Sequence, residues 1–585
     1  MADKVIVTNI TALKDKYGAT GLSKIHTAIK RLIAADKKRE ISTVLVALDN
    51  KKEMSAVQGT AVDDPLDPRQ NKNAIDAVFN ALTPDYLMIL GAIDVVPHQD
   101  LKNPLFTEDE NDEEGDNEES AFGDLPYACD ARYSRNIKNF TGPTRVVGRL
   151  PDLTGAKGSP KYLLGLLETA ATWKSRPVSA YRDYLGITAD AWTESTQESL
   201  TNIFSNDTDL QTSPTKGFKW TKKLINRRMH FINCHGGDTL SEFFGEAADD
   251  EDDMPVSHQA AFVGGTGRVA EGTVAAAECC FGAQLYDPTA EENGQMGMCN
   301  VYLQQKGYGF FGSSTTAYGP VTGNDEADLI CQYFIQRVLR GSSLGRATLE
   351  ARQRFIQKAS PLSPTNRKTL AQFSLLGDPS IHPVAKPKSK KVADHNFRVL
   401  TTGGASLGAK SLRTSKIALD AEAAERAERR DMLTTTGKGL TRLQPTYTKS
   451  KGRLPKKVQT SLAKYMKQMH CVPRESLSFC VDSPSAASAA KKSAAKKSKK
   501  KSGSPSKSVG ATPNRGTTGF HVMFGVPESR RRADGFRAGA ASKSVKKRSV
   551  TKGLMPGSGR LRKFIVLEAK EVDGKIVAVT EAHSK

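Results

Sequence analysis

The chain has 585 residues, of which 38% are hydrophobic and 25% are charged, and its formal net charge is +21. Nowhere do 18 apolar residues follow one another, which argues against a membrane-spanning helix. The charge is uneven: residues 386–585 carry 45 Lys and Arg against 14 Asp and Glu, whereas residues 1–385 carry 40 against 50. The sequence therefore predicts an acidic folded body followed by a basic appendage.

The cysteines give no sign of a metal ribbon or a disulfide framework. They stand at positions 129, 234, 279, 280, 299, 331, 471 and 480, with no CxxC pair and no regular spacing. We therefore expect reduced thiols. The N-terminal segment lacks the basic stretch and apolar run of a secretory signal, so we expect a cytoplasmic protein.

Short β-branched runs alternate with amphipathic helical stretches along the front of the chain. Continuous apolar strands separated by helices are typical of a mostly parallel sheet that helices cover on both faces. We therefore predict an α/β domain over residues 1–385. Strands are expected at 4–10, 42–48, 85–91, 229–234, 273–277 and 308–312, and helices from 10 to about 35 and at 72–82, 160–174, 325–340 and 344–358.

Two acidic segments interrupt this domain. Residues 107–120 hold nine carboxylates and residues 245–255 hold six, with few apolar residues among them. Dense like charge does not pack, so both are expected to be exposed loops that keep the protein in solution. Calcium binding or attraction of a basic ligand is the alternative, although neither segment has the spaced D-x-D-x-D-G pattern of a dedicated calcium loop.

The character of the sequence changes after residue 385. Residues 386–515 predict a basic low-complexity linker with short helices near 415–432 and 458–468. Residues 516–585 predict a small β-rich module, because two alternating apolar runs flank VDGK within 562–583, a hairpin signal. The linker has three interpretations: a nucleic-acid-binding tail, an inert spacer, or a tethered polypeptide substrate.

Two strand ends carry residues of the same chemistry. The run MHFINC (229–234) is followed by His235, Gly236 and Gly237, and the run TVAAAEC (273–279) is followed by Cys280. Reactive groups in open parallel sheets lie beyond the carboxyl ends of strands. An imidazole beside a thiol raises the thiolate fraction and later protonates a leaving amine. The amides of Gly236 and Cys280 would hold the developing oxyanion, so this pattern predicts a Cys–His dyad that needs no metal.

At these residues the sequence resembles the caspase-like cysteine peptidases, and among them the gingipain-type family. The resemblance extends over residues 42–384 with the order of the motifs kept. Its blocks are DYLMILGAIDVVP, DLPYACD (124–130), RVVGRLPDLT (145–154), HGGDTLSEFFG, GSSTTAYGPVTGNDE (312–326) and SLLGDPSIHP (374–383).

The resemblance implies roles for particular residues. The caspase pattern places the nucleophile two residues before a glycine and selects Cys280, whereas the gingipain-like pattern selects Cys279. With Cys280 as the nucleophile, Glu278 takes the position that lines the specificity pocket. Asp130 or Asp124 on DLPYACD would add a second charge, and Tyr318 would replace an aromatic wall of the family. A pocket with two carboxylates predicts cleavage after Arg or Lys.

The sequence therefore predicts a cysteine endopeptidase that cleaves polypeptides after basic residues and processes its own basic linker. It requires no cofactor, although calcium is compatible with the acidic loops. The alternative is an inactive caspase-like scaffold whose basic tail binds nucleic acid or a protein partner. No membrane partner is expected.

Overall fold

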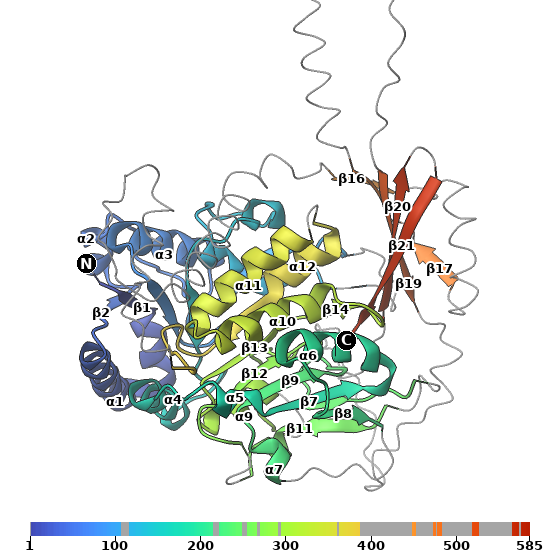
Figure 1. Ribbon diagram of the computed structural model, residues 1–585. Helices are drawn as coiled ribbons and strands as arrows, with labels where there is room; N and C mark the ends of the chain where they lie inside the picture. The colour runs from blue at the N-terminus through green and yellow to red at the C-terminus, as the bar shows by residue number, and fades with distance from the viewer. Residues whose placement is uncertain are drawn as a thin grey trace, which may run out of the picture. The chain divides into compact units, whose positions relative to one another are not determined.

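The computed structural model describes residues 2–106, 116, 118–214, 222–248, 254–265, 269–289, 294–359 and 362–385, and the segments 447–451, 472–475, 477–481, 518–525, 564–572 and 575–585. They belong to two compact units. The first comprises Met1–Phe106, Glu118–Thr441 and Lys585, and the second comprises Thr107–Asn117 and Arg442–Ser584. Figure 1 gives the order of the elements along the chain.

A ten-stranded sheet forms the centre of the first unit, in the order β2-β1-β3-β6-β15-β13-β12-β9-β7-β8. Neighbouring strands are parallel except β13 and β15, which run antiparallel. The predicted mostly parallel sheet is confirmed, with one reversal of direction. Its strands are β1 (Lys4–Thr8), β2 (Thr43–Ala47), β3 (Tyr86–Leu90), β6 (Val147–Leu150), β7 (Tyr184–Ala189), β8 (Leu210–Ser213), β9 (Met229–Asn233), β12 (Val274–Ala277), β13 (Gly309–Ser313) and β15 (Phe373–Leu376).

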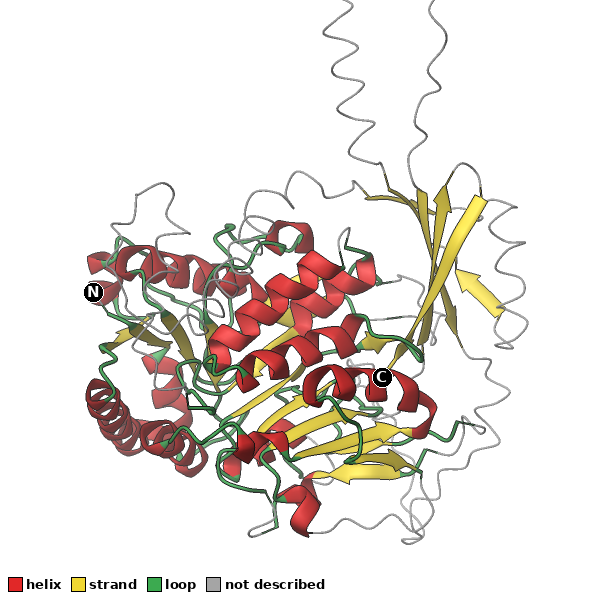
Figure 2. Cartoon of the chain, in the orientation of Figure 1, coloured by secondary structure: helices red, strands yellow, loops and turns green. Residues whose placement is uncertain are grey.

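Helices pack on both faces of this sheet, as the strand–helix alternation predicts (Figure 2). One hydrophobic core lies under α1 (Ile10–Lys38), α3 (Pro68–Leu82), α4 (Lys161–Thr172) and α9 (Met298–Gln304). The other lies under α5 (Ser179–Arg182), α6 (Thr193–Phe204), α10 (Glu326–Leu339), α11 (Leu344–Lys358) and α12 (Pro364–Gln372). The remaining helices are the short α2 (Lys51–Ala56), α7 (Lys222–Ile225) and α8 (Ala260–Val263) and three 3-10 turns, η1 (Leu125–Ala128), η2 (Ile137–Phe140) and η3 (Asp190–Trp192).

Successive residues of each central strand contribute to opposite cores, because side chains of a strand alternate between its two faces. In β12, Ala275 and Ala277 belong to the first core, and Val274 and Ala276 belong to the second. This alternation decides which side chains after β12 share a face.

Smaller strand pairs flank the main sheet. β4 (Gln99–Lys102) pairs antiparallel with β5 (Ser120–Gly123), and β10 (Glu242–Phe244) pairs antiparallel with β11 (Val256–Gln259). A two-residue strand, β14 (Tyr318–Gly319), follows β13 and leads toward α10.

The strands and helices predicted for the front of the chain are confirmed within a few residues at each end. Helix α12 was not predicted, because its sequence PTNRKTLAQ has no apolar stripe. Its start depends instead on a capping box, in which Ser363 and Asn366 bond reciprocally to the backbone.

The described part of the second unit consists of antiparallel strands. In the range predicted to form a hairpin, β20 (Phe564–Val572) pairs with β21 (Lys575–Ser584), and β19 (Thr518–Gly525) pairs with the other edge of β20. Three strands fall within the range predicted as linker, namely β16 (Tyr447–Lys451), β17 (Val472–Glu475) and β18 (Leu477–Val481). The two helices expected at 415–432 and 458–468, and most of the linker, lie outside the described residues.

Among the described residues, no helix combines the length and apolar character needed to cross a lipid bilayer.

Candidate active site

The ends of β9 and β12 bring the two predicted reactive residues to neighbouring positions. The strands are parallel and adjacent, with Ile232 paired to Ala277, and His235 and Cys280 each follow three residues later. A Cβ built on Gly236 would lie 1.9 Å from the carbonyl oxygen of Cys280, so the two chain segments touch. Glycine is therefore required here for the backbones to approach, and not only to leave room for a substrate.

An acidic and an aromatic residue hold the imidazole of His235. Its Nε2 lies 2.5 Å from Oε2 of Glu246, and its ring centroid lies 4.4 Å from that of Trp192. The backbone of His235 also exchanges two hydrogen bonds with Phe244. A carboxylate on one ring nitrogen fixes the orientation of an imidazole and stabilises its protonated form.

The two adjacent cysteines point to opposite faces of the sheet. Cys279 belongs to the core that contains Ala275 and Ala277, whereas Cys280 belongs to the core on the other face. The Cys280 thiol lies 3.5 Å from the carbonyl oxygen of Ala317 and accepts a hydrogen bond from the Ala317 amide at 3.3 Å. Burial raises the pKa of the Cys280 thiol to about 12, so the structure contains a neutral thiol.

Lys585 lies beside Cys280 and contributes to the same compact unit as the sheet. The Cys280 amide donates a hydrogen bond of 2.5 Å to the main-chain oxygen of Lys585, and the Lys585 amide donates one of 3.0 Å to Ala317. The Lys585 ammonium lies 2.5 Å from Oδ2 of Asp328 and 3.4 Å from Oε2 of Glu278. Lys585 thus places its ammonium between the carboxylates of Asp328 and Glu278. Its main-chain oxygen lies within hydrogen-bond distance of the Cys280 amide.

The pocket around this ammonium is closed and closely fitted. The side chains of Lys585, Glu278 and Asp328 are all 0% exposed. The ammonium lies 5.3 Å from the ring centroid of Trp192, within the range of a cation–π contact. A Cβ on Gly319 would lie 2.3 Å from Cε of Lys585, so the absence of a side chain at position 319 makes room for the lysine.

Electrostatics favour one positive charge in this pocket. Burial raises the pKa of Glu278 well above its ordinary value, and the nearby Asp328 charge raises it further, whereas Lys585 lowers it. Burial alone would lower the pKa of Lys585, but the Asp328 and Glu278 carboxylates raise it. The lysine is therefore protonated, and its charge favours the ionised form of the buried acids beside it.

A comparison with known protein families identifies the family of the chain. The family model of peptidase family C25 matches residues 3–384. The chain belongs to peptidase family C25. It is therefore a cysteine peptidase, as the sequence motifs indicate. No curated protein matches the chain.

Solved structures resemble the C25 peptidase at low sequence identity. One, described as "Structure of Protease", has 13% identity, a TM-score of 0.41 and coverage of 65% of this chain and 78% of its own. Another is the crystal structure of the Arg-specific cysteine proteinase gingipain R (RGPB), with 9% identity, a TM-score of 0.43 and the same coverages.

Only one of the acids that were predicted to line the specificity pocket lies beside the Lys585 ammonium. Glu278 lies in the pocket, but the second acid there is Asp328 and not Asp124 or Asp130. Asp124 is buried and bonds to Arg149 at 2.6 Å and to His98 at 2.9 Å. Although burial alone would raise it, the contacts with Arg149 and His98 hold the pKa of Asp124 well below its ordinary value.

Asp130 and Tyr318 also lie in other surroundings than predicted. Asp130 has a 70% exposed side chain that pairs with Arg145. The ring of Tyr318 is buried and lies 5.5 Å from the ammonium of Lys368, whereas its neighbour Gly319 borders the lysine. The pocket wall on this segment is therefore backbone and not an aromatic ring.

Three residues of the site were missed from the sequence. Glu246 lies in the segment predicted as an acidic loop, Asp328 lies in the first turn of α10, and Trp192 ends a 3-10 turn far from any motif. Acidic residues are common in first helical turns and in loops, so their types carried no signal. Trp192 was the residue whose role could most easily have been suspected from the sequence. The chain has only three tryptophans, and a buried indole ring often packs against a specific side chain.

Two further histidines are buried in the core near β9. His230 lies between the Tyr302 hydroxyl at 2.7 Å and the Arg227 carbonyl oxygen at 2.9 Å. His258 is also buried and bonds to Tyr302 at 2.9 Å. It pairs with Phe243 across β10 and β11, a contact that sequence order alone does not show.

No cluster of three or more His, Cys, Asp or Glu residues suited to a metal occurs in the part of the chain that the structure describes. Most of the two acidic inserts, residues 107–115 and 249–253, falls outside that part. Calcium binding by these segments therefore stays a prediction.

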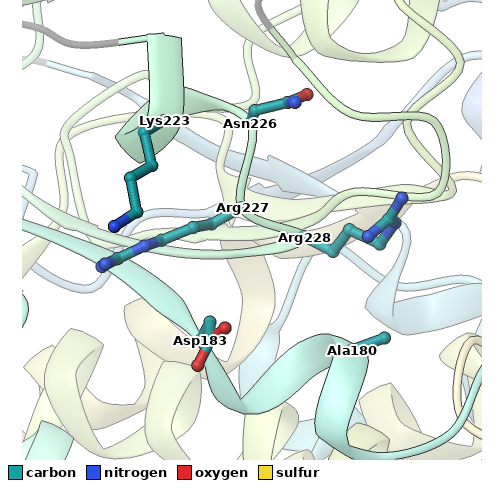
Figure 3. A pocket seen from close by; sticks show the side chains of 6 residues that line it. All are labelled: Ala180, Asp183, Lys223, Asn226, Arg227 and Arg228. Atoms are coloured by element: carbon teal, nitrogen blue, oxygen red, sulfur yellow. The ribbon is translucent and has the colours of Figure 1, made fainter.

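A separate cavity of about 490 Å³ lies at the end of the sheet opposite to the candidate active site. Figure 3 shows its lining, which includes Asp183, Lys223, Arg227 and Arg228. Arg227 and Arg228 precede β9 and Asp183 precedes β7, so this cavity lies at the amino ends of strands whose carboxyl ends carry the candidate active site. Arg227 already pairs with Asp209 at 2.9 Å.

Proposed function

We propose that this protein is an endopeptidase that cleaves polypeptides after lysine and arginine, with Cys280 as the nucleophile and His235 as the general acid and base. The observation that carries the proposal is the position of Lys585. Its carbonyl oxygen accepts a hydrogen bond from the Cys280 amide while its ammonium lies between Asp328 and Glu278. A substrate residue before a scissile bond needs both contacts at once.

Face alternation supports Cys280 over Cys279. In an extended segment, residues 278 and 280 share a face and residue 279 points away. Glu278 contacts the lysine, and Cys280 belongs to the core of the same face, whereas Cys279 packs in the opposite core. A thiol on the far face of the sheet has no path to a carbonyl group held at the Cys280 amide.

In the proposed reaction, His235 takes the proton of Cys280, and the thiolate attacks the carbonyl carbon of the basic residue. The electron pair of the carbonyl bond moves to oxygen, where the amides of Cys280 and Gly236 hold the negative charge. The imidazolium then donates its proton to the amide nitrogen, and the carbon–nitrogen bond breaks. Water, which loses a proton to the neutral imidazole, hydrolyses the thioester and releases the thiol.

Glu246 has a positioning role in this scheme. Its hydrogen bond to Nε2 of His235 holds the orientation of the ring and stabilises the imidazolium that forms during attack. The pocket acids Asp328 and Glu278 select a cationic side chain, because an acidic or neutral side chain would leave buried charge without a partner.

Peptidyl coumarylamides ending in lysine, arginine, norleucine or glutamate test the proposal. We expect cleavage of the first two by the wild-type protein and none by Cys280→Ala or His235→Ala. A lysyl or arginyl acyloxymethylketone should label the wild-type protein and not Cys280→Ala. Cleavage of the norleucine substrate at the same kcat/KM as the lysine substrate would contradict the proposed specificity.

The basic segment 386–515 is a proposed substrate of the same site, because it presents many lysines and arginines on the same polypeptide. Incubation should shorten the wild-type chain and leave Cys280→Ala at full length. A chain that takes no label, and is retained on DNA in a salt-sensitive manner, would instead favour the inactive scaffold.

A further inference from the structure

Lys585 satisfies every recognition element of the pocket by itself. Its amide bonds to Ala317, its carbonyl oxygen bonds to Cys280, and its ammonium contacts Asp328, Glu278 and Trp192. We propose that Lys585 is an intramolecular inhibitor that occupies the specificity pocket as a substrate residue would. The inference rests on the proposed function, because it takes this pocket to be where substrates bind.

No room is left for a second lysine while Lys585 is bound. The ammonium, Glu278 and Asp328 are all 0% exposed, and Gly319 lies against the lysine stem. The Cys280 side chain is also almost buried, at 3% exposure. Lys585 must therefore leave before a polypeptide binds, and its departure opens a path from solvent to the thiol.

Tethering makes such an occupant effective even when its own affinity is weak. A ligand on the same chain has an effective concentration on the order of 1 mM. If a free lysyl peptide binds with a Kd of about 0.1 mM, the pocket is empty in roughly one molecule in ten, which raises the apparent KM of a substrate about tenfold. A small reagent reaches Cys280 only in molecules whose pocket is empty, so the alkylation rate is reduced by the same factor.

The first experiment measures access to the thiol and does not depend on catalysis. Alkylation of Cys280 by iodoacetamide, followed by peptide mass spectrometry, should be about tenfold faster in Lys585→Ala and in Lys585→Met than in the wild-type chain. Methionine keeps most of the length of the side chain and removes only its charge. The control is Lys306→Ala, which removes a surface lysine with 65% side-chain exposure and should not change the rate.

The second experiment measures cleavage of a lysyl coumarylamide. Lys585→Ala should lower KM about tenfold and leave kcat unchanged. Adding the peptide acetyl-Glu-Ala-His-Ser-Lys, which has the sequence of residues 581–585, should restore competitive inhibition, whereas the same peptide ending in norleucine should not. Thermal unfolding of each variant verifies that the fold is retained.

The two experiments distinguish a failure of the inhibitor hypothesis for Lys585 from a failure of the proposed peptidase function. Equal alkylation rates in the wild-type chain and both Lys585 variants would overturn the inhibitor, whatever the cleavage assay gives. Faster alkylation without cleavage of any basic substrate would support occupation of the pocket and overturn the proposed peptidase specificity. Cleavage with the same KM in the wild-type chain and Lys585→Ala would overturn the inhibitor and support the proposed function.

Discussion

Replacing Asp328 with asparagine removes the carboxylate that lies closer to the lysine ammonium, at 2.5 Å against 3.4 Å for Glu278. Both partners of this ion pair are 0% exposed, so the remaining charge is not compensated by water. Breaking a buried pair of this kind costs about 3–5 kcal/mol. Glu278 offsets part of that loss, because removal of the neighbouring Asp328 charge lowers its pKa and favours its ionised form.

We therefore expect a loss of about 3 kcal/mol, which corresponds to a decrease of roughly 100-fold in kcat/KM for a lysyl substrate. A norleucine substrate of similar size should change little, because it makes no ion pair. The assay compares both coumarylamides with Asp328→Asn in the Lys585→Ala background, so that the pocket is vacant. Asp130→Asn is the control, since that carboxylate is 70% exposed and pairs with Arg145.

Two results would refute this reasoning. An equal decrease for the lysine and norleucine substrates would mean that Asp328 supports the fold of the site and not its charge preference. An unchanged lysine to norleucine ratio in the double variant Asp328→Asn with Glu278→Gln would mean that substrates do not use this pocket.

Three further predictions concern the reacting groups. Cys280→Ala should abolish cleavage, whereas Cys279→Ala should keep it and lower the free energy of unfolding by about 1 kcal/mol, as measured by urea denaturation. Glu246→Gln should lower kcat about 100-fold with little change in KM, because the His235 imidazole loses its orienting partner; a change in KM alone would exclude this role. Burial raises the pKa of Glu278 well above its ordinary value and a bound lysine lowers it, so lysine binding releases a proton. KM for a lysyl substrate should therefore fall as pH rises through this raised pKa, above the range where an ordinary glutamate titrates, and Glu278→Gln should remove that dependence.

Much of the fold was accessible from the sequence because its signals are local. The strands β1, β3, β9 and β12 are continuous apolar runs, and buried parallel strands have this pattern. The reversal between β13 and β15 was not accessible. Direction depends on where the chain re-enters the sheet after α12, and that helix has no apolar periodicity.

Sequence order shows which residues follow adjacent strands, but it does not show which distant segments meet beside them. His235 and Cys280 follow adjacent parallel strands, so their proximity follows from strand order. Asp328 reaches the pocket from α10, and Glu246 reaches His235 from a segment whose composition predicts only exposure. Asp124 and Asp130 had the right residue type, but arginines already neutralise them.

The tandem cysteines after β12 make the site sensitive to chain length. Deleting a single residue between 274 and 278 would turn every later side chain of this segment to the other face of the sheet. Cys280 would then point to the face that Cys279 now occupies. Either Phe281 or Cys279 would take its place beside the pocket. A shift of one residue thus separates the proposed nucleophile Cys280 from a cysteine packed in the opposite core, and insertions or deletions in 274–278 should be far less tolerated than point substitutions there.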